Sequence, residues 1–206
     1  MMNALLASPW LWVLVCGYLL VYFFSRPELK GWLSARFVRL QAWLLLPASV
    51  YRAIGQVEIP AGTGRGKIRI EHLYVSKYGV FIVETRHLGG WIYGSEHEPM
   101  WTQKFRNGRR QHFRNPLRES CCHARTLAEA LNLPEEALIP MVIFTGDSLF
   151  RTEKPDHVCY SLEFVFCIRQ HKEVLLSPSE VARVLQVIAE KQRVSGWRIG
   201  RQPVAE

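Results

Sequence analysis

The most informative segment for the fold is Lys67–Arg86, KIRIEHLYVSKYGVFIVETR. It contains two runs rich in β-branched and aromatic residues, which are separated only by Lys77 and Tyr78. Two such runs on either side of a short link are typical of a β-hairpin, so we expect antiparallel strands here. Because side chains alternate along a strand, Glu84 and Arg86 share one face and Thr85 has the other.

Acidic residues on the two strands of this hairpin define a candidate site. Glu71 lies on the first strand, and antiparallel pairing is expected to bring it near Glu84 on the second. Two carboxylates beside the cation of Arg86 are what a metal-dependent phosphodiesterase needs, because oxygen ligands hold Mg²⁺, the metal activates water, and a cation steadies the phosphate. A Glu and an Arg on one strand face are more often an exposed salt bridge, so the spacing alone leaves both interpretations open.

The rest of the body alternates between helical and β patterns. An Asn-Pro pair at 115–116 marks a helix start, and the Ser177–Glu180 segment is a capping box with proline at the first helical position. Predicted helices cover residues 31–46, 117–131 and a segment after 177; predicted strands cover 51–59, 89–95, 138–145, 158–160 and 163–169. This order predicts an α/β domain in which helices flank a mixed sheet.

Residues 4–25 predict a single transmembrane helix. The segment carries no charged side chain, and its apolar run at residues 4–24 would be about 31 Å long as a helix, which matches the hydrocarbon core of a bilayer. Basic residues follow it closely and none precedes it, so the positive-inside rule places the body in the cytoplasm. A cleaved signal peptide would have a basic start and a small-residue cleavage site, and the segment has neither. We therefore expect a single-pass membrane protein, with the lipid bilayer as its partner and the inner membrane of a bacterium as its location.

The predicted division of the remaining chain is an amphipathic helix at 26–50, the main domain at 51–193 and a C-terminal tail at 194–206. The helix carries an apolar stripe at helical spacing, formed by Leu33, Phe37, Leu40 and Leu44. Such a helix packs on its domain, lies on the membrane surface, or does both, and packing on the domain is the commoner outcome.

The charge balance favours a polyanion or an anionic membrane surface as partner. The chain has 26 Lys and Arg against 18 Asp and Glu, a net charge of +8. Residues 104–118 hold basic side chains and no acid, with aromatic rings at Phe105 and Phe113 and a third, Trp101, just before the stretch. Such a stretch suits DNA or RNA, or is a solvated loop attracted to anionic lipid. The candidate nucleic-acid contacts are Lys104, Arg106, Arg109, Arg110 and Arg114.

The cysteines point away from a metal site and from a disulfide scaffold. The chain has 5 cysteines at irregular spacings, and none forms a Cys-x-x-Cys pair or another zinc pattern. We therefore expect reduced thiols, in line with a cytosolic domain.

Several separate motifs in this order resemble a known family. Residues 68–103, IRIEHLYVSKYGVFIVETRHLGGWIYGSEHEPMWTQ, and then residues 113–123, FRNPLRESCCH, are similar to the nuclease-related (NERD) domain. The resemblance covers roughly residues 30–191, and N-terminal membrane anchors also occur in that family. It implies a restriction-endonuclease-like mixed sheet of the PD-(D/E)xK nuclease superfamily, with a site that uses Mg²⁺.

The resemblance also assigns site residues. Glu71 stands for the strand aspartate, Glu84 for the glutamate of the E-x-K element and Arg86 for its lysine. Glu119 stands for the glutamine after Asn115-Pro116. These four are the candidate catalytic residues, and Glu71 and Glu84 are the candidate Mg²⁺ ligands. His72 is expected on the face opposite Glu71, in a packing role.

The departures from the family pattern predict an eroded site. The glutamate of the first helix aligns with Ala35, which offers no ligand. The guanidinium of Arg86 cannot lose a proton and is a planar fork, unlike the ammonium of lysine. Three functions remain open: a tethered Mg²⁺-dependent nuclease, a weakened relative that binds nucleic acid or a protein at the membrane, and a module whose charge serves anionic lipid.

Overall fold

The computed structural model describes residues 13, 17–18, 27–60, 67–194 and 198–199 of the chain. Within them, the main sheet has six strands in the order β10-β1-β2-β3-β7-β9. Strands β1, β2 and β3 are antiparallel, whereas β7 runs parallel to β3 and β9 parallel to β7. The predicted hairpin is therefore confirmed, with Ser76 opposite Gly79. The strands are β1 (Arg52–Pro60), β2 (Lys67–Ser76), β3 (Gly79–His87), β7 (Leu138–Thr145), β9 (Val158–Tyr160) and β10 (Arg198–Ile199).

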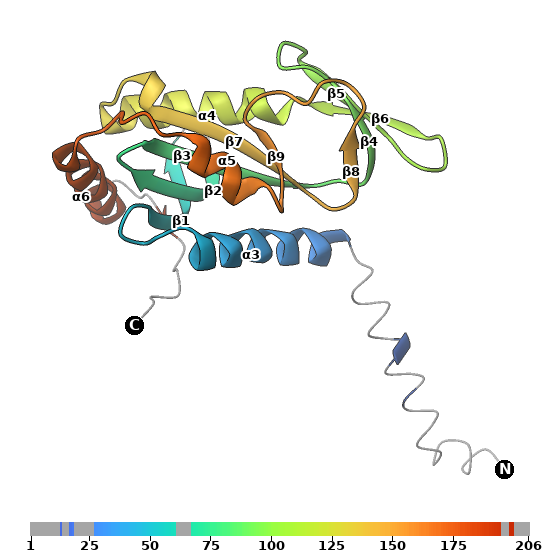
Figure 1. The fold of residues 1–206 in the computed structure, drawn as a ribbon, viewed down its shortest axis with the longest axis horizontal. Coiled ribbons are helices and arrows are strands. Elements are labelled where there is room, and N and C mark those ends of the chain that lie inside the picture. Colours follow the sequence, from blue (N-terminus) through green and yellow to red (C-terminus); the bar gives the residue numbers. More distant parts are fainter. Residues whose placement is uncertain (1–12, 14–16, 19–26, 61–66, 195–197, 200–206) are drawn as a thin grey trace.

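Helices cover both faces of this sheet, which confirms the predicted mixed α/β class (Figure 1). One face packs on α4 (Pro116–Leu131) and α6 (Pro178–Val194), with Ile82, Leu127 and Ile188 in a shared core. The other face packs on α3 (Pro27–Leu45) and α5 (Phe164–Gln170), with Val38, Phe81 and Ile168 in the core. A short 3-10 helix, η1 (Glu135–Ala137), leads from α4 into β7.

A second, four-stranded sheet lies at one end of the molecule, in the order β6-β5-β4-β8 (Figure 1). Its inner face buries Ile92 and Trp101 against Phe144 of β7. Gly94 makes this packing possible, because a Cβ there would lie 2.3 Å from the Trp101 ring. Only β4 of this sheet was predicted, since the polar sequence at 104–118 resembles a loop. The strands are β4 (Gly90–Tyr93), β5 (Met100–Lys104), β6 (Arg110–Arg114) and β8 (Ser148–Phe150).

Local signals placed two helix starts correctly. The side chain of Asn115 accepts hydrogen bonds from the N–H groups of Leu117 and Arg118, so it caps α4. The Ser177 N–H donates to the Glu180 carboxylate at 2.7 Å, and the Glu180 N–H donates back to the Ser177 hydroxyl at 3.3 Å. This is the predicted capping box.

Residues 163–169 are a helix, so the predicted strand there was wrong. Phe164, Val165 and Ile168 of α5 are buried together, which is the spacing of one helical face. The apolar run within this segment has only five residues, Phe164 to Ile168, which is too short for periodicity to separate a helix from a buried strand.

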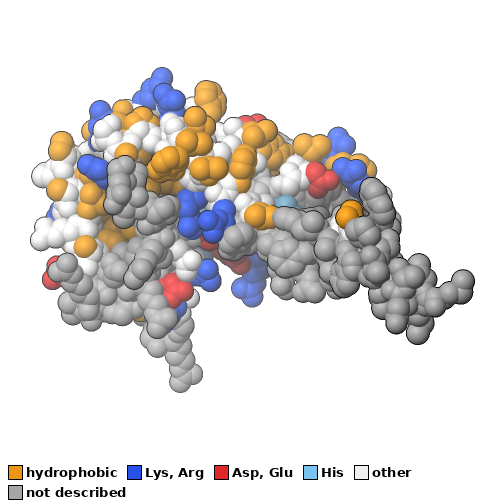
Figure 2. Space-filling model, turned by 90° about the horizontal axis from the view of Figure 1, so that it is seen from below, with side chains coloured by type: hydrophobic (Ala, Val, Ile, Leu, Met, Phe, Trp, Pro, Cys, Tyr) orange, Lys and Arg blue, Asp and Glu red, His pale blue; other side chains and the backbone are white. Residues whose placement is uncertain are grey.

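The apolar stripe of α3 does not face the domain, contrary to the expected packing. Val38, Ala42 and Leu46 pack against the sheet instead. The predicted stripe faces outward, and its exposed fractions run from 39% at Leu33 to 61% at Leu44. Figure 2 views the molecule from this side and shows hydrophobic side chains gathered over it, with Lys and Arg side chains beside them.

Most residues of the predicted anchor and of the predicted C-terminal tail lie outside the residues that the structure describes. The anchor at residues 4–25 lies outside the described residues except for Val13, Gly17 and Tyr18. In the parts of the chain that the structure describes, no helix combines the length and apolar character needed to cross a bilayer. In the predicted tail, Arg198 and Ile199 pair with β1, and the other residues from 195 onward are not described.

Two cysteines are paired, so the expectation of reduced thiols was wrong for them. Cys159 at β9 and Cys167 of α5 form a disulfide, with their Cα atoms 6.9 Å apart. Cys121 and Cys122 at the start of α4 are free and exposed. Although Cys121 as a whole residue is exposed, partial burial of its sulfur raises the pKa of the thiol, which makes it a poor nucleophile.

Candidate functional site

Glu84 is a buried carboxylate in the last part of β3. It follows Ile82 on the face covered by α4, and only 3% of the residue is exposed. Its two oxygens have different partners: His123 Nδ1 lies 2.6 Å from Oε1, and Arg86 Nη2 donates to Oε2 at 3.3 Å. A carboxylate this deeply buried would be costly without such partners.

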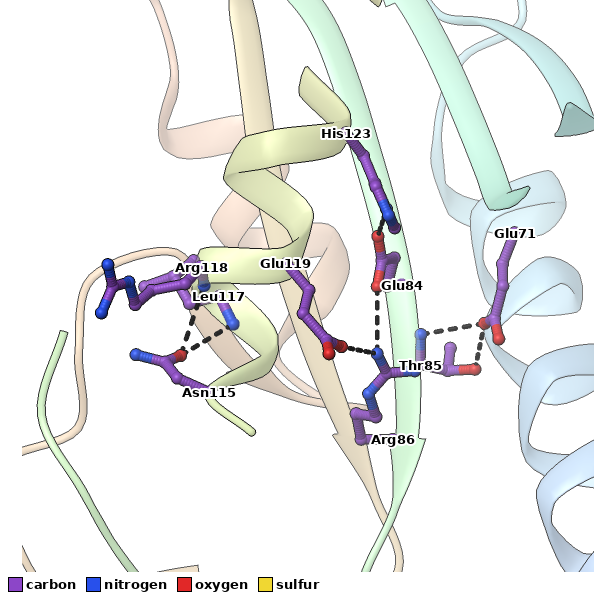
Figure 3. Close-up of polar contacts among 9 residues, drawn as sticks. All are labelled: Glu71, Glu84, Thr85, Arg86, Asn115, Leu117, Arg118, Glu119 and His123. Carbon is purple, nitrogen blue, oxygen red and sulfur yellow. Dashed lines mark hydrogen bonds and ion pairs between the residues drawn. The ribbon is translucent and has the colours of Figure 1, made fainter. Parts of the chain in front are cut away.

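Arg86 connects this carboxylate to α4. The strand alternation places its side chain on the same face as Glu84, as predicted, and its Nη2 also donates to Glu119 Oε2 at 3.0 Å. The four residues form a continuous chain of contacts, Glu119–Arg86–Glu84–His123, which we call the Arg86 cluster (Figure 3). Three of the four predicted catalytic residues therefore meet here.

His123 is the member of the cluster that the sequence analysis missed. It comes four residues after Glu119 on α4, so both side chains leave the same face of the helix. That spacing was the available signal, because the face of α4 that carries Glu119 must also carry His123. Asn115 fixes where the helix begins and therefore which residues turn toward β3.

Glu71 does not join the cluster. Its Oε2 accepts a hydrogen bond from the Thr85 N–H at 2.9 Å and another from the Thr85 hydroxyl. Figure 3 shows Glu71 and Thr85 on the side of β3 turned toward α3, and Glu84 on the side turned toward α4. The expectation that pairing would bring Glu71 near Glu84 was therefore wrong.

An irregularity in β2 explains the separation. Val57 of β1 pairs with Ile70, but Gly55 pairs with Leu73, so β2 has one residue more than β1 over this interval. A bulge of this kind breaks the alternation of side chains. The paired ladder with β3 begins at His72 opposite Val83, and Glu71 lies just before it.

Glu71 and His72 line the same cleft, so the prediction that they occupy opposite faces was wrong. The cleft, on the α3 side, has a volume of about 360 Å³ and includes Ala35 and Thr85. His72 is 2% exposed, and neither ring nitrogen has a hydrogen-bond partner. Burial, assisted by the charge of Arg39, lowers the pKa of His72 to about 4, so its ring is neutral at pH 7. Three arginines line the cleft: Arg36, Arg39 and Arg69.

The Arg86 cluster does not fit the Mg²⁺ that the nuclease superfamily implies. Magnesium prefers carboxylate oxygens and water in octahedral geometry. Here the oxygens of Glu84 face a guanidinium and an imidazole, and the second predicted ligand, Glu71, is bound to Thr85 across the strand. Among the described residues, no group of three or more His, Cys, Asp and Glu is arranged to hold a metal.

The predicted basic residues lie on the β5–β6 hairpin. Its register pairs Lys104 with Arg110 and Met100 with Arg114, which places the three cations on one face. Arg106 and Arg109 lie in the connecting turn, where Arg106 contacts Asp147 at 2.9 Å and Arg109 lies over the Phe105 ring. Trp101 is buried in the core, so this predicted stacking ring is not available.

Comparison with known proteins agrees with the motifs in the sequence. The family model described as NERD, nuclease-related domain, matches residues 30–145. The chain is similar to an uncharacterised protein of Bacillus anthracis, with 32% identity over 167 residues, which are 79% of this chain and 76% of that protein. No solved structure matches the chain.

Proposed function

The chain belongs to the nuclease-related domain family, and from this premise we propose that it binds nucleic acid at a membrane without cleaving it. The observation that carries this proposal is the position of Arg86, whose guanidinium contacts both Glu84 and Glu119. A cation here offsets part of the negative charge that would otherwise attract a metal ion and occupies oxygens that would otherwise bind it. The nuclease-type site is therefore closed by the protein's own side chains.

The β5–β6 hairpin supports the binding part of the proposal. Lys104, Arg110 and Arg114 share one face of the hairpin. Arg110 and Arg114 are exposed there, and Lys104 is half-buried. Cations spaced along an exposed strand pair can follow a phosphate backbone, which is the main source of sequence-independent affinity for nucleic acid.

The outward stripe of α3 supports the membrane part. Exposed apolar side chains on a helix beside a basic surface are typical of a helix that lies in the membrane interface. In the proposed arrangement, residues 4–25 cross the bilayer and the stripe from Leu33 to Leu44 rests on its cytoplasmic surface. Figure 1 shows α3 and the β5–β6 hairpin on different sides of the molecule, so lipid and nucleic acid would not compete for one surface.

The proposal is tested with the full chain in nanodiscs of neutral lipid. Fluorescence anisotropy would measure its binding to labelled DNA and RNA oligonucleotides at 50 and 200 mM salt. We expect the affinity to fall by about 10-fold or more over this range. Each of at least three phosphate contacts releases counterions from the nucleic acid, and this release is less favourable at higher salt. We expect no cleavage of the same oligonucleotides in Mg²⁺ or Mn²⁺.

A charge-matched control separates the hairpin from general charge. The triple variant Lys104→Gln, Arg110→Gln and Arg114→Gln is expected to lose most of the affinity. The triple variant Arg52→Gln, Arg169→Gln and Lys172→Gln removes the same charge from other exposed positions and is expected to retain it. Metal-dependent cleavage that Glu84→Gln abolishes would restore the nuclease interpretation. Retention on anionic vesicles without any binding to oligonucleotides would leave the lipid module as the function.

A further inference from the structure

The outer face of the second sheet brings aromatic and basic side chains together. The ladder pairs Trp91 with Lys104 and Tyr93 with Thr102. It continues from Thr102 to His112 across β5 and β6, and the Thr102 hydroxyl lies 3.0 Å from His112 Nδ1. Side chains of paired residues lie on the same face of a sheet, so these residues form one surface. We call it the outer platform: Trp91, Tyr93, Thr102, Lys104, Arg110, His112 and Arg114.

The rings of the outer platform are accessible and not part of the core. Tyr93 is 37% exposed and Trp91 is partly exposed. By contrast, Ile92, which lies between them on β4, and Trp101 of the neighbouring strand β5 are completely buried on the inner face. A tryptophan and a tyrosine two positions apart on one strand place two rings about 7 Å apart, at about 3.3 Å per residue.

The charge of the outer platform has one sign. The four strands carry Lys104, Arg110 and Arg114, and their sequences contain no aspartate or glutamate. Two cations lie over the Trp91 ring: Lys104 Nζ is 5.4 Å and the Arg151 guanidinium 5.2 Å from its centroid. A planar group that stacks on Trp91 would replace one of these flexible side chains over the ring, and the displaced cation would then lie close to the phosphates of the same ligand.

We propose that the outer platform binds single-stranded nucleic acid, with bases stacked on Trp91 and Tyr93 and phosphates held by Lys104, Arg110, Arg114 and Arg151. The inference rests on the proposed function and adds the strandedness of the ligand and the way its bases are held. In a duplex the faces of the bases are covered by their neighbours, so only unpaired bases can lie flat on exposed rings. Open sheets that bind RNA use aromatic side chains in this way to stack two or three bases.

Three probes of equal length distinguish stacking from charge attraction. They are a labelled 12-nucleotide thymidine strand, a 12-base-pair duplex, and a 12-unit abasic deoxyribose-phosphate strand. The full chain in neutral nanodiscs is expected to bind the thymidine strand more tightly than the other two. The abasic strand carries the same phosphates but no bases, so its weaker binding measures the contribution of the bases.

Ring-removing variants then test the two aromatic side chains. We expect Trp91→Leu and Tyr93→Leu each to weaken binding of the thymidine strand by about 5- to 150-fold, the equivalent of about 1–3 kcal/mol for one stacked base. Binding of the abasic strand should change little. Two controls keep both rings and should keep the affinity. Tyr93→Phe removes only a hydroxyl, and Leu149→Ala removes an exposed apolar side chain next to Trp91.

The outcomes separate this inference from the function on which it rests. If both Leu variants bind the thymidine strand as the wild type does, stacking is overturned, while the salt-sensitive binding through the hairpin still stands. If the wild type binds none of the three probes, the proposed function falls as well. If the Leu variants lose binding to phosphatidylglycerol vesicles and not to the thymidine strand, the surface contacts lipid and the inference is overturned.

Discussion

The carboxylate of Glu71 is bound to Thr85 through both the backbone N–H and the hydroxyl of that residue. Glu71 therefore lies on the α3 side of the sheet, while Glu84, next to Thr85 in the chain, lies on the α4 side. This relationship divides the acids of the predicted nuclease site between two faces. It also joins β2 to β3 just beyond the end of their paired ladder.

The Glu71–Thr85 contact is expected to stabilise the end of the hairpin. Thr85→Val keeps the shape of the side chain but removes the hydroxyl donor, and it should lower the free energy of unfolding by about 0.5–1.5 kcal/mol. Thr85→Ser keeps the hydroxyl and serves as the matched control. Urea denaturation of the detergent-solubilised chain measures both. Equal stability of Thr85→Val and wild type would show that the hydroxyl contact contributes nothing.

The Arg86 cluster predicts unequal effects for two arginines. Arg86→Met leaves the buried Glu84 without its cation and should lower the free energy of unfolding by about 1–3 kcal/mol. Arg125→Met breaks the exposed pair with Glu135, in which both side chains are more than 60% exposed. That change should cost less than about 1 kcal/mol. A smaller loss for Arg86→Met than for Arg125→Met would contradict the assigned role of Arg86.

His72 predicts a loss of stability in mild acid. Its pKa is about 4 in the folded chain against 6.5 for an unperturbed histidine. Between these values the unfolded chain binds a proton that the folded chain does not, so the free energy of unfolding falls as the pH is lowered from 6.5 toward 4. The loss reaches about 3 kcal/mol at the lower end of this window.

Urea denaturation at several pH values measures this slope. His72→Leu should remove most of it, whereas replacement of the exposed His97 by Gln should leave it unchanged. An undiminished slope in His72→Leu would assign the acid sensitivity to other groups.

The orientation of α3 predicts opposite results for adjacent residues. Val38 is completely buried and Phe37 is 46% exposed. Val38→Ala should lower the free energy of unfolding by about 1–3 kcal/mol, whereas Phe37→Ala should change it by less than about 0.5 kcal/mol. Binding of the domain to lipid should respond in the opposite order. Helix α3 would have to face the other way if Phe37→Ala proved the more destabilising change.

Local sequence signals were sufficient for much of the fold. Strands β2 and β7 have the predicted bounds. Both are central strands, in which a hydrophobic run bounded by turn residues indicates where the strand begins and ends. The starts of α4 and α6 follow from side chains that bond to backbone groups two or three residues away. The contacts involved are short-range, so the sequence contains them directly.

Other features depended on contacts between distant residues. Strands β5 and β6 pack through Trp101 and Phe113 onto β7. Their other positions are polar or charged, so hydrophobic periodicity did not predict these two strands. The stripe of α3 predicted an amphipathic helix correctly but assigned its faces wrongly, because apolar spacing does not say which surface covers it. The bulge in β2 turns the Glu71 side chain to the opposite face of the sheet, and no glycine or other turn residue in β2 marks its position.

Local residue patterns were enough to predict that a β-hairpin carries Glu71, Glu84 and Arg86, that a helix begins after Asn115 with Glu119 in its first turn, and that the domain resembles a nuclease. Contacts between distant segments were needed to show that Glu84, Arg86, Glu119 and His123 form one cluster while Glu71 faces a different cleft. The difference arises from strand register. One extra residue in β2 sends a side chain to the other face of the sheet, and only the packing of three neighbouring strands determines where that residue is accommodated.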